Sequence, residues 1–137
     1  MNNLQLSVLT PEKKVSETEA LSVTLPTKMG DITVLPSHAP LFSLLAPGEI
    51  IIRKAQGSPE SLVVSGGYVS VFKNQVKVLA DFSMQSSDIN EQAAKEAIER
   101  AKQAMEEKVS DESFALAEAE MRKALAQLWV AQKRKRN

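Results

Sequence analysis

Few residues in this 137-residue chain could do chemistry, and the single histidine, His38, is the most conspicuous of them. It lies between two prolines in the stretch GDITVLPSHAPL, directly after a short apolar run. A histidine placed there could be a catalytic base, a metal ligand, a docking residue or a turn residue. Asp31 and Ser37 are too close to it in sequence to predict a Ser-His-Asp triad assembled by the fold. One histidine in a chain without cysteine also cannot supply a histidine-rich or thiolate metal site.

Two other patterns that could carry chemistry have plainer interpretations. Gly66-Gly67 follows one expected strand and precedes another, whereas a phosphate-binding loop opens a helix. We therefore interpret the pair as a tight turn or a β-bulge. The carboxylates that could form acid–base pairs are concentrated on the expected solvent faces of helices. The residues themselves do not predict an enzyme.

The C-terminal stretch LWVAQKRKRN ends in a run of four cations, Lys133 to Arg136. Arg122, Trp129, Lys133 and Arg136 fall near one stripe of a helix. They could be a frayed, solubilising end, because cations suit a helix C-terminus. They could also belong to a docking helix, with Trp129 as an aromatic anchor and the cations steering it toward an acidic partner. Nucleic-acid binding lacks a supporting basic sheet or aromatic platform.

The composition sets broad limits. Acids and bases balance at 17 each, so no bulk charge selects nucleic acid or an anionic membrane. The N-terminal stretch lacks the features of a signal peptide, and no apolar run approaches the ~18 residues that cross a bilayer. We expect a soluble, intracellular protein whose membrane association comes only through a partner.

Glycine and proline divide the chain, because all of them lie at or before Gly67. Before that point the alternation of apolar and polar residues predicts short strands separated by turn residues. The strands are expected at residues 4–8, 21–25, 32–35, 49–53, 61–65, 68–72 and 76–80, with Pro26 closing the second. Seven or more strands at this spacing favour an antiparallel β-sandwich or barrel.

From Ser87 onward the pattern is helical. Ser87 or Asp88 is expected to cap a first helix with Glu91 completing a capping box, and Ser110-Asp111 to cap a second. One stripe comprises Ile89, Ala93, Ala97, Ala101, Ala104, Met105 and Val109, and the other Phe114, Ala117, Met121, Ala124, Leu125, Leu128 and Ala131. Helices joined by about three residues fold back as a hairpin. Alanine offers little apolar area, so this hairpin should be held weakly and detach at modest cost.

These features predict an α+β chain with two parts. Residues 1–85 form the antiparallel β-sandwich or barrel, and residues 86–137 form the antiparallel helical hairpin.

With both parts in place, GDITVLPSHAPL (30–41), SGGYVSVF with QVKVLAD (65–81) and the opening SVLTP (7–11) closely resemble the epsilon-subunit family of F-type ATP synthases. The resemblance covers nearly the whole chain. It implies a non-catalytic central-stalk subunit of a rotary motor, on the cytoplasmic face of a bacterial inner or thylakoid-type membrane. In that family the sandwich grips the gamma subunit and sits on the c-subunit ring, linking gamma rotation to proton transport. Asp31 and His38 then lie on the docking edge, and the prolines preorganise the His38 loop for binding.

The resemblance also implies that the hairpin regulates ATP hydrolysis. In the family it either folds against the sandwich or extends along gamma, where its basic second helix meets acidic segments of the catalytic beta subunits and inhibits hydrolysis. The matching candidates here are Arg122, Lys123, Lys133, Arg134, Lys135 and Arg136. A two-state element of this kind needs a gap of only a few kcal/mol.

Some bacterial relatives bind ATP in the folded hairpin through the motif Ile/Leu-Asp-x-x-Arg-Ala. Here that stretch begins at Ile89, but the acid is replaced by Asn90 and the arginine by Ala93. Losing the arginine removes a charge-assisted hydrogen bond to phosphate. Arg100 and Lys123 remain as possible contributors. We predict weak or absent ATP binding and no cofactor.

A second hypothesis from a different class is a free-standing β-sandwich binding module with a helical dimerisation hairpin. The first hypothesis predicts a chain that is monomeric when isolated and binds gamma tightly. The second predicts a stable homodimer without any partner.

Overall fold

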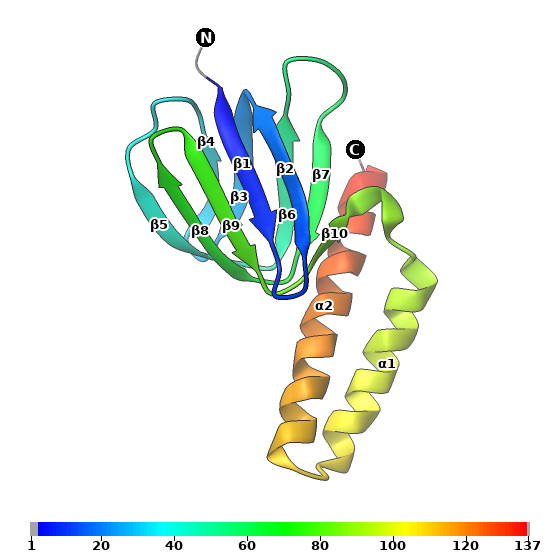
Figure 1. Cartoon of the computed structure of the whole chain (residues 1–137). Helices are drawn as coiled ribbons and strands as arrows, with labels where there is room; N and C mark the ends of the chain where they lie inside the picture. The colour runs from blue at the N-terminus through cyan, green and yellow to red at the C-terminus, as the bar shows by residue number, and fades with distance from the viewer. Residues whose placement is uncertain (1–2, 137) are drawn as a thin grey trace.

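The computed structural model describes residues 3–136, which form ten strands followed by two long helices (Figure 1). The strands are β1 (Leu4–Leu9), β2 (Lys14–Ala20), β3 (Ser22–Thr27), β4 (Gly30–Val34), β5 (Leu41–Leu45), β6 (Gly48–Arg53), β7 (Glu60–Val64), β8 (Gly67–Phe72), β9 (Gln75–Ala80) and β10 (Ser83–Gln85). A 3₁₀ turn (Ser86–Asp88) leads to α1 (Glu91–Glu107) and α2 (Asp111–Arg136). The predicted fold class, a β-sandwich followed by a helical hairpin, is confirmed.

The strands form one sheet that curls over itself, in the order β10-β7-β6-β3-β5-β8-β9-β1-β2, with β4 paired to β3. The link between β3 and β5 is a single residue pair, Thr27 with Leu45, so the sheet bends there into two layers. All pairs are antiparallel except β1 with β9, which run parallel. Those two strands are distant in the chain and no hairpin joins them, so no turn imposes an antiparallel direction.

The core lies between the two layers. Alternate residues point into it, as Leu4, Leu6 and Val8 do from β1, each with no exposed surface. Strands β3, β6, β7, β8 and β9 contribute alternating valine, leucine and isoleucine in the same way. The sandwich therefore has a core built from residues 4 to 80, separate from the hairpin.

Three strands were not predicted from the sequence, each for a local reason. The edge strand β2 is exposed or half-buried at every residue but Ala20, so its pattern is polar. In β5 the residues LFSLL are apolar on both faces, and alternation is lost. Strand β10 is only three residues long. The expectation that Pro26 ends its strand is wrong, since β3 continues to Thr27 and Pro26 pairs with Asp31.

The first helix begins later than expected. Asn90 caps it, because its side-chain oxygen accepts a hydrogen bond from the Ala93 amide at 2.9 Å. The expected cap at Ser87 or Asp88 is wrong: those residues belong to the 3₁₀ turn, and Ile89 then adopts an extended conformation. The second cap is confirmed, as Ser110 Oγ accepts from the Ser113 amide at 3.0 Å.

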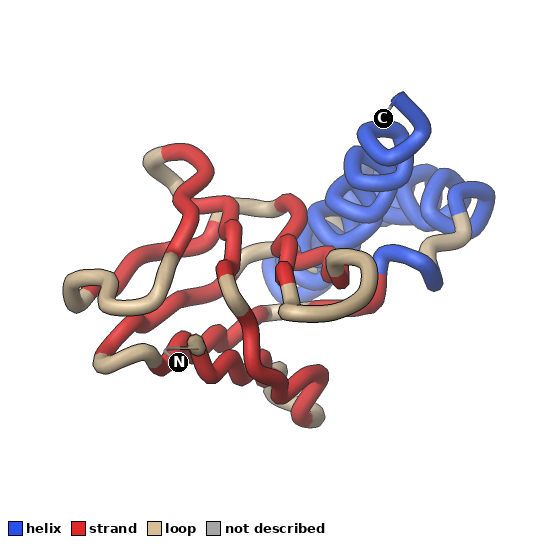
Figure 2. The backbone as a smooth tube through the Cα atoms, turned by 90° about the horizontal axis from the view of Figure 1, so that it is seen from above, coloured by secondary structure: helices blue, strands red, loops and turns tan. Residues whose placement is uncertain are grey.

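The two helices run side by side as a hairpin, with α2 between α1 and the strands (Figures 1 and 2). The α1 stripe is confirmed at Ala101, which is buried, but Ala93 and Val109 are exposed and Ala94 is buried instead. In α2, Ala117 and Ala124 are buried one heptad apart. A second buried set, Ala126 and Val130, faces the sandwich, so α2 carries apolar residues on two sides.

Candidate functional site

The loop that carries His38 connects β4 to β5 and is tied to a neighbouring turn. The Ser37 amide donates a hydrogen bond of 2.6 Å to the Asn74 side-chain oxygen in the β8–β9 turn. The His38 amide donates to the Leu35 carbonyl, and the ring Nδ1 lies 2.7 Å from the carbonyl oxygen of Ala39. These contacts use the half-buried histidine to shape its own loop.

Asp31 lies at the other end of β4 from this loop. It is an exposed residue of β4, paired with Pro26, and it follows a β3–β4 turn whose Met29 side chain is 93% exposed. Thr27 Oγ1 closes that turn by donating to the Gly30 carbonyl at 2.5 Å. Strand β4 runs from residue 30 to residue 34. Because a strand rises about 3.4 Å per residue, Asp31 lies roughly 10 Å or more from the start of the His38 loop. Asp31 and the His38 loop therefore lie at the two ends of β4, and their shared role at a docking edge stays a prediction.

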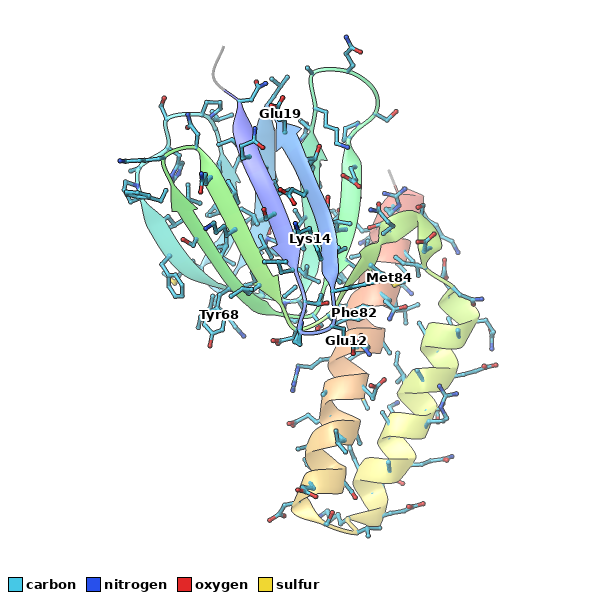
Figure 3. All side chains as sticks on the ribbon, viewed as in Figure 1. Glu12, Lys14, Glu19, Tyr68, Phe82 and Met84 are labelled. Atoms are coloured by element: carbon cyan, nitrogen blue, oxygen red, sulfur yellow. The ribbon has the colours of Figure 1, made fainter. Side chains whose placement is uncertain are left out.

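A third surface was not predicted from the sequence. On the outward faces of β5, β8 and β9, five large apolar side chains are 46–70% exposed: Phe42, Leu44, Tyr68, Phe72 and Leu79. We call these five residues the outer apolar face. Leu44 and Leu79 both lie opposite Tyr68 in the strand registers. Figure 3 shows Tyr68 projecting outward from the sandwich.

A groove crosses one part of the outer apolar face. It has a volume of about 570 Å³ and is lined by Pro40, Leu41, Phe42, Ser70, Val71, Phe72, Gln75 and Lys77. Contiguous exposed apolar area of this kind is typical of a surface that another molecule covers. The sequence signal was aromatic residues at alternate positions to the core-facing valines in YVSVF (68–72), and the mainly apolar stretch LFSLL (41–45), which pairs with it in the sheet.

The hairpin meets the sandwich through a small apolar junction. Val63 of β7 packs with Ala126 and Val130 of α2, and Met84 and Ile89 cover this cluster. Figure 3 shows Phe82 and Met84 on the side of the sandwich that faces α2. The cluster has three buried members, of which Ala126 and Val130 lie outside the predicted stripes, so the apolar area between hairpin and sandwich is small. That the hairpin detaches at modest cost stays a prediction.

The cationic tail, Lys133 to Arg136, reinforces this junction. Lys133 Nζ lies 3.1 Å from Glu49 Oε1 on β6, and an Arg134 guanidinium nitrogen lies 3.9 Å from Glu49 Oε2. The Glu49 side chain is only 6% exposed and also accepts a hydrogen bond from Ser61 Oγ. Lys135 pairs with Glu91 on α1 at 2.8 Å. Glu49 was missed by sequence reasoning, because its partner is 84 residues away.

The two remaining candidates on α2 also lie near the sandwich. Arg122 pairs with Glu118 at 3.7 Å and lines a cleft of about 350 Å³ together with Lys28, Tyr68 and Asp81. Lys123 Nζ lies 4.7 Å from the centre of the Phe82 ring, a cation–π contact.

The structure does not gather the residues of the degraded nucleotide motif. Ile89 packs into the apolar junction, Asn90 caps α1, and Ala93 is exposed. Arg100 is exposed in a shallow depression formed by α1 residues alone, whereas Lys123 lies over Phe82 on the sandwich side of α2. The two cations therefore do not converge.

Within residues 3–136, no group of three His, Asp or Glu side chains is arranged to hold a metal ion. The helices described there are too short or too polar to cross a membrane.

Comparison with known protein families accounts for nearly all of this architecture. Residues 3–85 match the family described as ATP synthase, Delta/Epsilon chain, beta-sandwich domain, and residues 87–132 match its long alpha-helix domain. The chain belongs to the ATP synthase delta/epsilon chain family. Relatives named ATP synthase epsilon chain include one from Alkalilimnicola ehrlichii, 34% identical over 99% of this chain and 97% of the relative. Another, from Moorella thermoacetica, is 38% identical over 96% of this chain and 98% of the relative.

A solved structure shares the fold of this family member. A chain of the Euglena gracilis mitochondrial ATP synthase superimposes with a TM-score of 0.70, covering 89% of this chain and 77% of that one at 18% identity. The family assignment confirms the first of the two hypotheses drawn from the sequence, the epsilon subunit of an F-type ATP synthase.

Proposed function

We propose that this epsilon-family chain is a non-catalytic central-stalk subunit that links gamma rotation to the c ring and inhibits ATP hydrolysis through its hairpin. The observation that carries the proposal is the combination of the outer apolar face with a hairpin docked through a small apolar cluster and two ion pairs to Glu49. The first is suited to permanent binding of a protein partner. The second is suited to reversible movement.

The outer apolar face is proposed to bind gamma. Its five side chains expose large apolar groups on a rigid sheet, and aromatic residues on such a surface supply most of the affinity at protein interfaces. The adjoining His38 loop, held by Asn74 and by its prolines, extends this rigid surface.

The β3–β4 turn is proposed to bind the c ring. The turn exposes Met29 almost fully and is followed by the exposed Asp31 near the start of β4, so an apolar and a charged group can contact polar loops of a partner. Contact with the ring would hold the chain at the cytoplasmic face of a bacterial inner or thylakoid-type membrane as part of a peripheral complex.

The described hairpin is the folded state, and the inhibitory state is proposed to be an extended one. Lys133 and Arg134 pair with Glu49 on the sandwich, and Lys135 pairs with Glu91 on α1. Arg122 pairs only with Glu118 on its own helix, and Arg136 is exposed. Extension would free the tail to meet acidic segments of the beta subunits. ATP is proposed to bind weakly or not at all, because Arg100 and Lys123 do not converge; isothermal titration giving micromolar affinity would overturn this.

The experiment is ATP hydrolysis by a complex of alpha, beta and gamma subunits, titrated with this chain. One version is full length, and the other ends after Asp88, which keeps every residue of the sandwich core. We expect both to bind and only the full chain to inhibit. If both bind and neither inhibits, the inhibitory role is wrong and the coupling role stands. Failure of both to bind gamma, or a stable homodimer of the isolated chain, would sink the central-stalk proposal.

A further inference from the structure

Glu49 lies where the sandwich, the 3₁₀ turn and the last turns of α2 meet. Ser61 Oγ donates to one of its oxygens, and Ser61 is itself 2.6 Å from Ser86 Oγ in the 3₁₀ turn. Lys133 and Arg134 approach the carboxylate from α2. The aromatic ring of Trp129 lies under the Lys133 ammonium at 5.2 Å and reaches toward Gly48, the neighbour of Glu49. A single carboxylate thus joins three elements.

The charges in this cluster depend on one another. With α2 docked, the Glu49 side chain is 6% exposed, so its charge has lost nearly all of its water. Removing one partner of a buried ion pair leaves a charge without compensation, which is far more costly than losing a surface pair. Lys133 and Arg134 are 29% and 48% exposed, so they keep part of their own hydration. If Glu49 loses its cationic partners, its carboxylate can be hydrated again only when α2 moves away from the sandwich. Loss of the partners therefore favours the undocked helix.

We propose that Glu49 holds the hairpin closed by binding Lys133 and Arg134, the same cations that bind the acidic partner of α2 during inhibition. We call this contact of Glu49 with Lys133 and Arg134 the latch. The closed state and the partner complex then compete for one pair of side chains. The second half of this inference rests on the proposed inhibitory contact, whereas the closing role of Glu49 does not.

Because the closed state and the partner complex use the same cations, substitutions of Glu49 and substitutions of the cations should differ in their effect on inhibition. Glu49→Lys places a third cation against Lys133 and Arg134, so it opens the hairpin but leaves both cations able to bind a partner. The double substitution Lys133→Gln and Arg134→Gln leaves Glu49 uncompensated, so it also opens the hairpin, but it removes the groups that bind the partner. Both should lower the closed-to-open ratio by about tenfold, and they should have opposite effects on inhibition.

A matched control and a rescue come from the same segment. Lys135→Gln with Arg136→Gln removes two charges from the same tail, yet Lys135 pairs with Glu91 inside the hairpin and not with the sandwich. This control should leave the hairpin closed. Combining Glu49→Lys with Lys133→Glu and Arg134→Glu exchanges the signs and should close the hairpin again.

The position of the hairpin is measured first in the isolated full chain. The chain has no cysteine, so Ser58→Cys and Val109→Cys, both exposed, introduce two spin labels on the sandwich and at the hairpin tip. Electron–electron distance measurements should show a new population in the two opening variants and its loss in the charge-exchanged chain. Unchanged distances in both opening variants, or equal opening in the control, would overturn the latch.

Hydrolysis by the complex of alpha, beta and gamma is measured second. Glu49→Lys should inhibit more strongly than the parent chain, and the Lys133, Arg134 variant more weakly. If the distances respond but Glu49→Lys inhibits no better, the competition is wrong while the latch remains. If the distances respond and no variant or parent inhibits, the inhibitory part of the proposed function is wrong. If the parent inhibits and the distances do not respond, the latch alone fails.

Discussion

The rings of Phe42 and Tyr68 stack on the outer surface of the sandwich, with centroids 5.7 Å apart and planes inclined by 29°. The pair joins β5 to β8, yet Phe42 is 70% and Tyr68 47% exposed. Aromatic area that remains in water does little for folding, so its value lies in what can cover it.

The first prediction concerns this pair. Phe42→Ser with Tyr68→Ser should reduce affinity for gamma by at least about a hundredfold, in the range of a binding hot spot, and lower the free energy of unfolding by less than about 1.5 kcal/mol. Surface plasmon resonance with immobilised gamma, together with urea unfolding, measures both. Leu21→Ser is the control, because Leu21 is a large, 41% exposed side chain away from this face. Equal loss of affinity in the control would contradict the assignment.

The second prediction concerns the close approach of β8 and β9. Gly67 has φ +133°, and a Cβ there would lie 2.0 Å from the Leu79 carbonyl oxygen. Gly67→Ala should therefore cost about 3 kcal/mol or more of unfolding free energy, from strain and overpacking together. Gly57→Ala is the control: its φ is +87°, but nothing lies within 4 Å, so it should cost about 1 kcal/mol. Similar denaturation midpoints for the two variants would refute the argument.

The third prediction concerns the start of α1. Asn90→Ala removes the oxygen that accepts from the Ala93 amide and should cost about 1 kcal/mol in the first turn. Asn90→Asp keeps the acceptor and adds a charge that suits a helix N-terminus, so it should be neutral or stabilising. Hydrogen exchange at the Ala93 amide reports directly on this turn. Unaltered protection in the alanine variant would mean that the cap does not hold the turn.

The fourth prediction separates catalysis from docking in the His38 loop. His38→Gln should leave the turnover of the assembled complex within about twofold, whereas loss of a general base costs 10² to 10⁴-fold. Asn74→Gly keeps the left-handed backbone of that turn (φ 62°) but removes the acceptor of the Ser37 amide, so it should weaken gamma binding several-fold. A hundredfold drop in turnover for His38→Gln would contradict this prediction and indicate a catalytic role for His38.

Local pattern was sufficient for the sandwich and the hairpin. Alternation along β1, β6 and β9 has period two and the later stripes have period near 3.6, and each pattern has one stable way to bury its apolar side. The alternation pattern failed to predict strands or surfaces where a residue's polarity does not reflect whether it is buried. Phe42, Leu44 and Tyr68 are apolar although their side chains are exposed on the outer apolar face. Strand β2 is polar because it lies at the edge of the sheet.

The sequence by itself determined seven of the strands, the change from strands to helices, the cap at Ser110 and the family resemblance, since each depends on residues close together in the chain. Only the tertiary structure decided that the Ser37 amide meets Asn74, that Arg100 and Lys123 do not converge, and that Glu49 meets Lys133. These relationships join segments whose separation in space is set by strand register and by how α2 docks. Charge attraction acts through space, so no spacing along the chain encodes which carboxylate a distant lysine will reach.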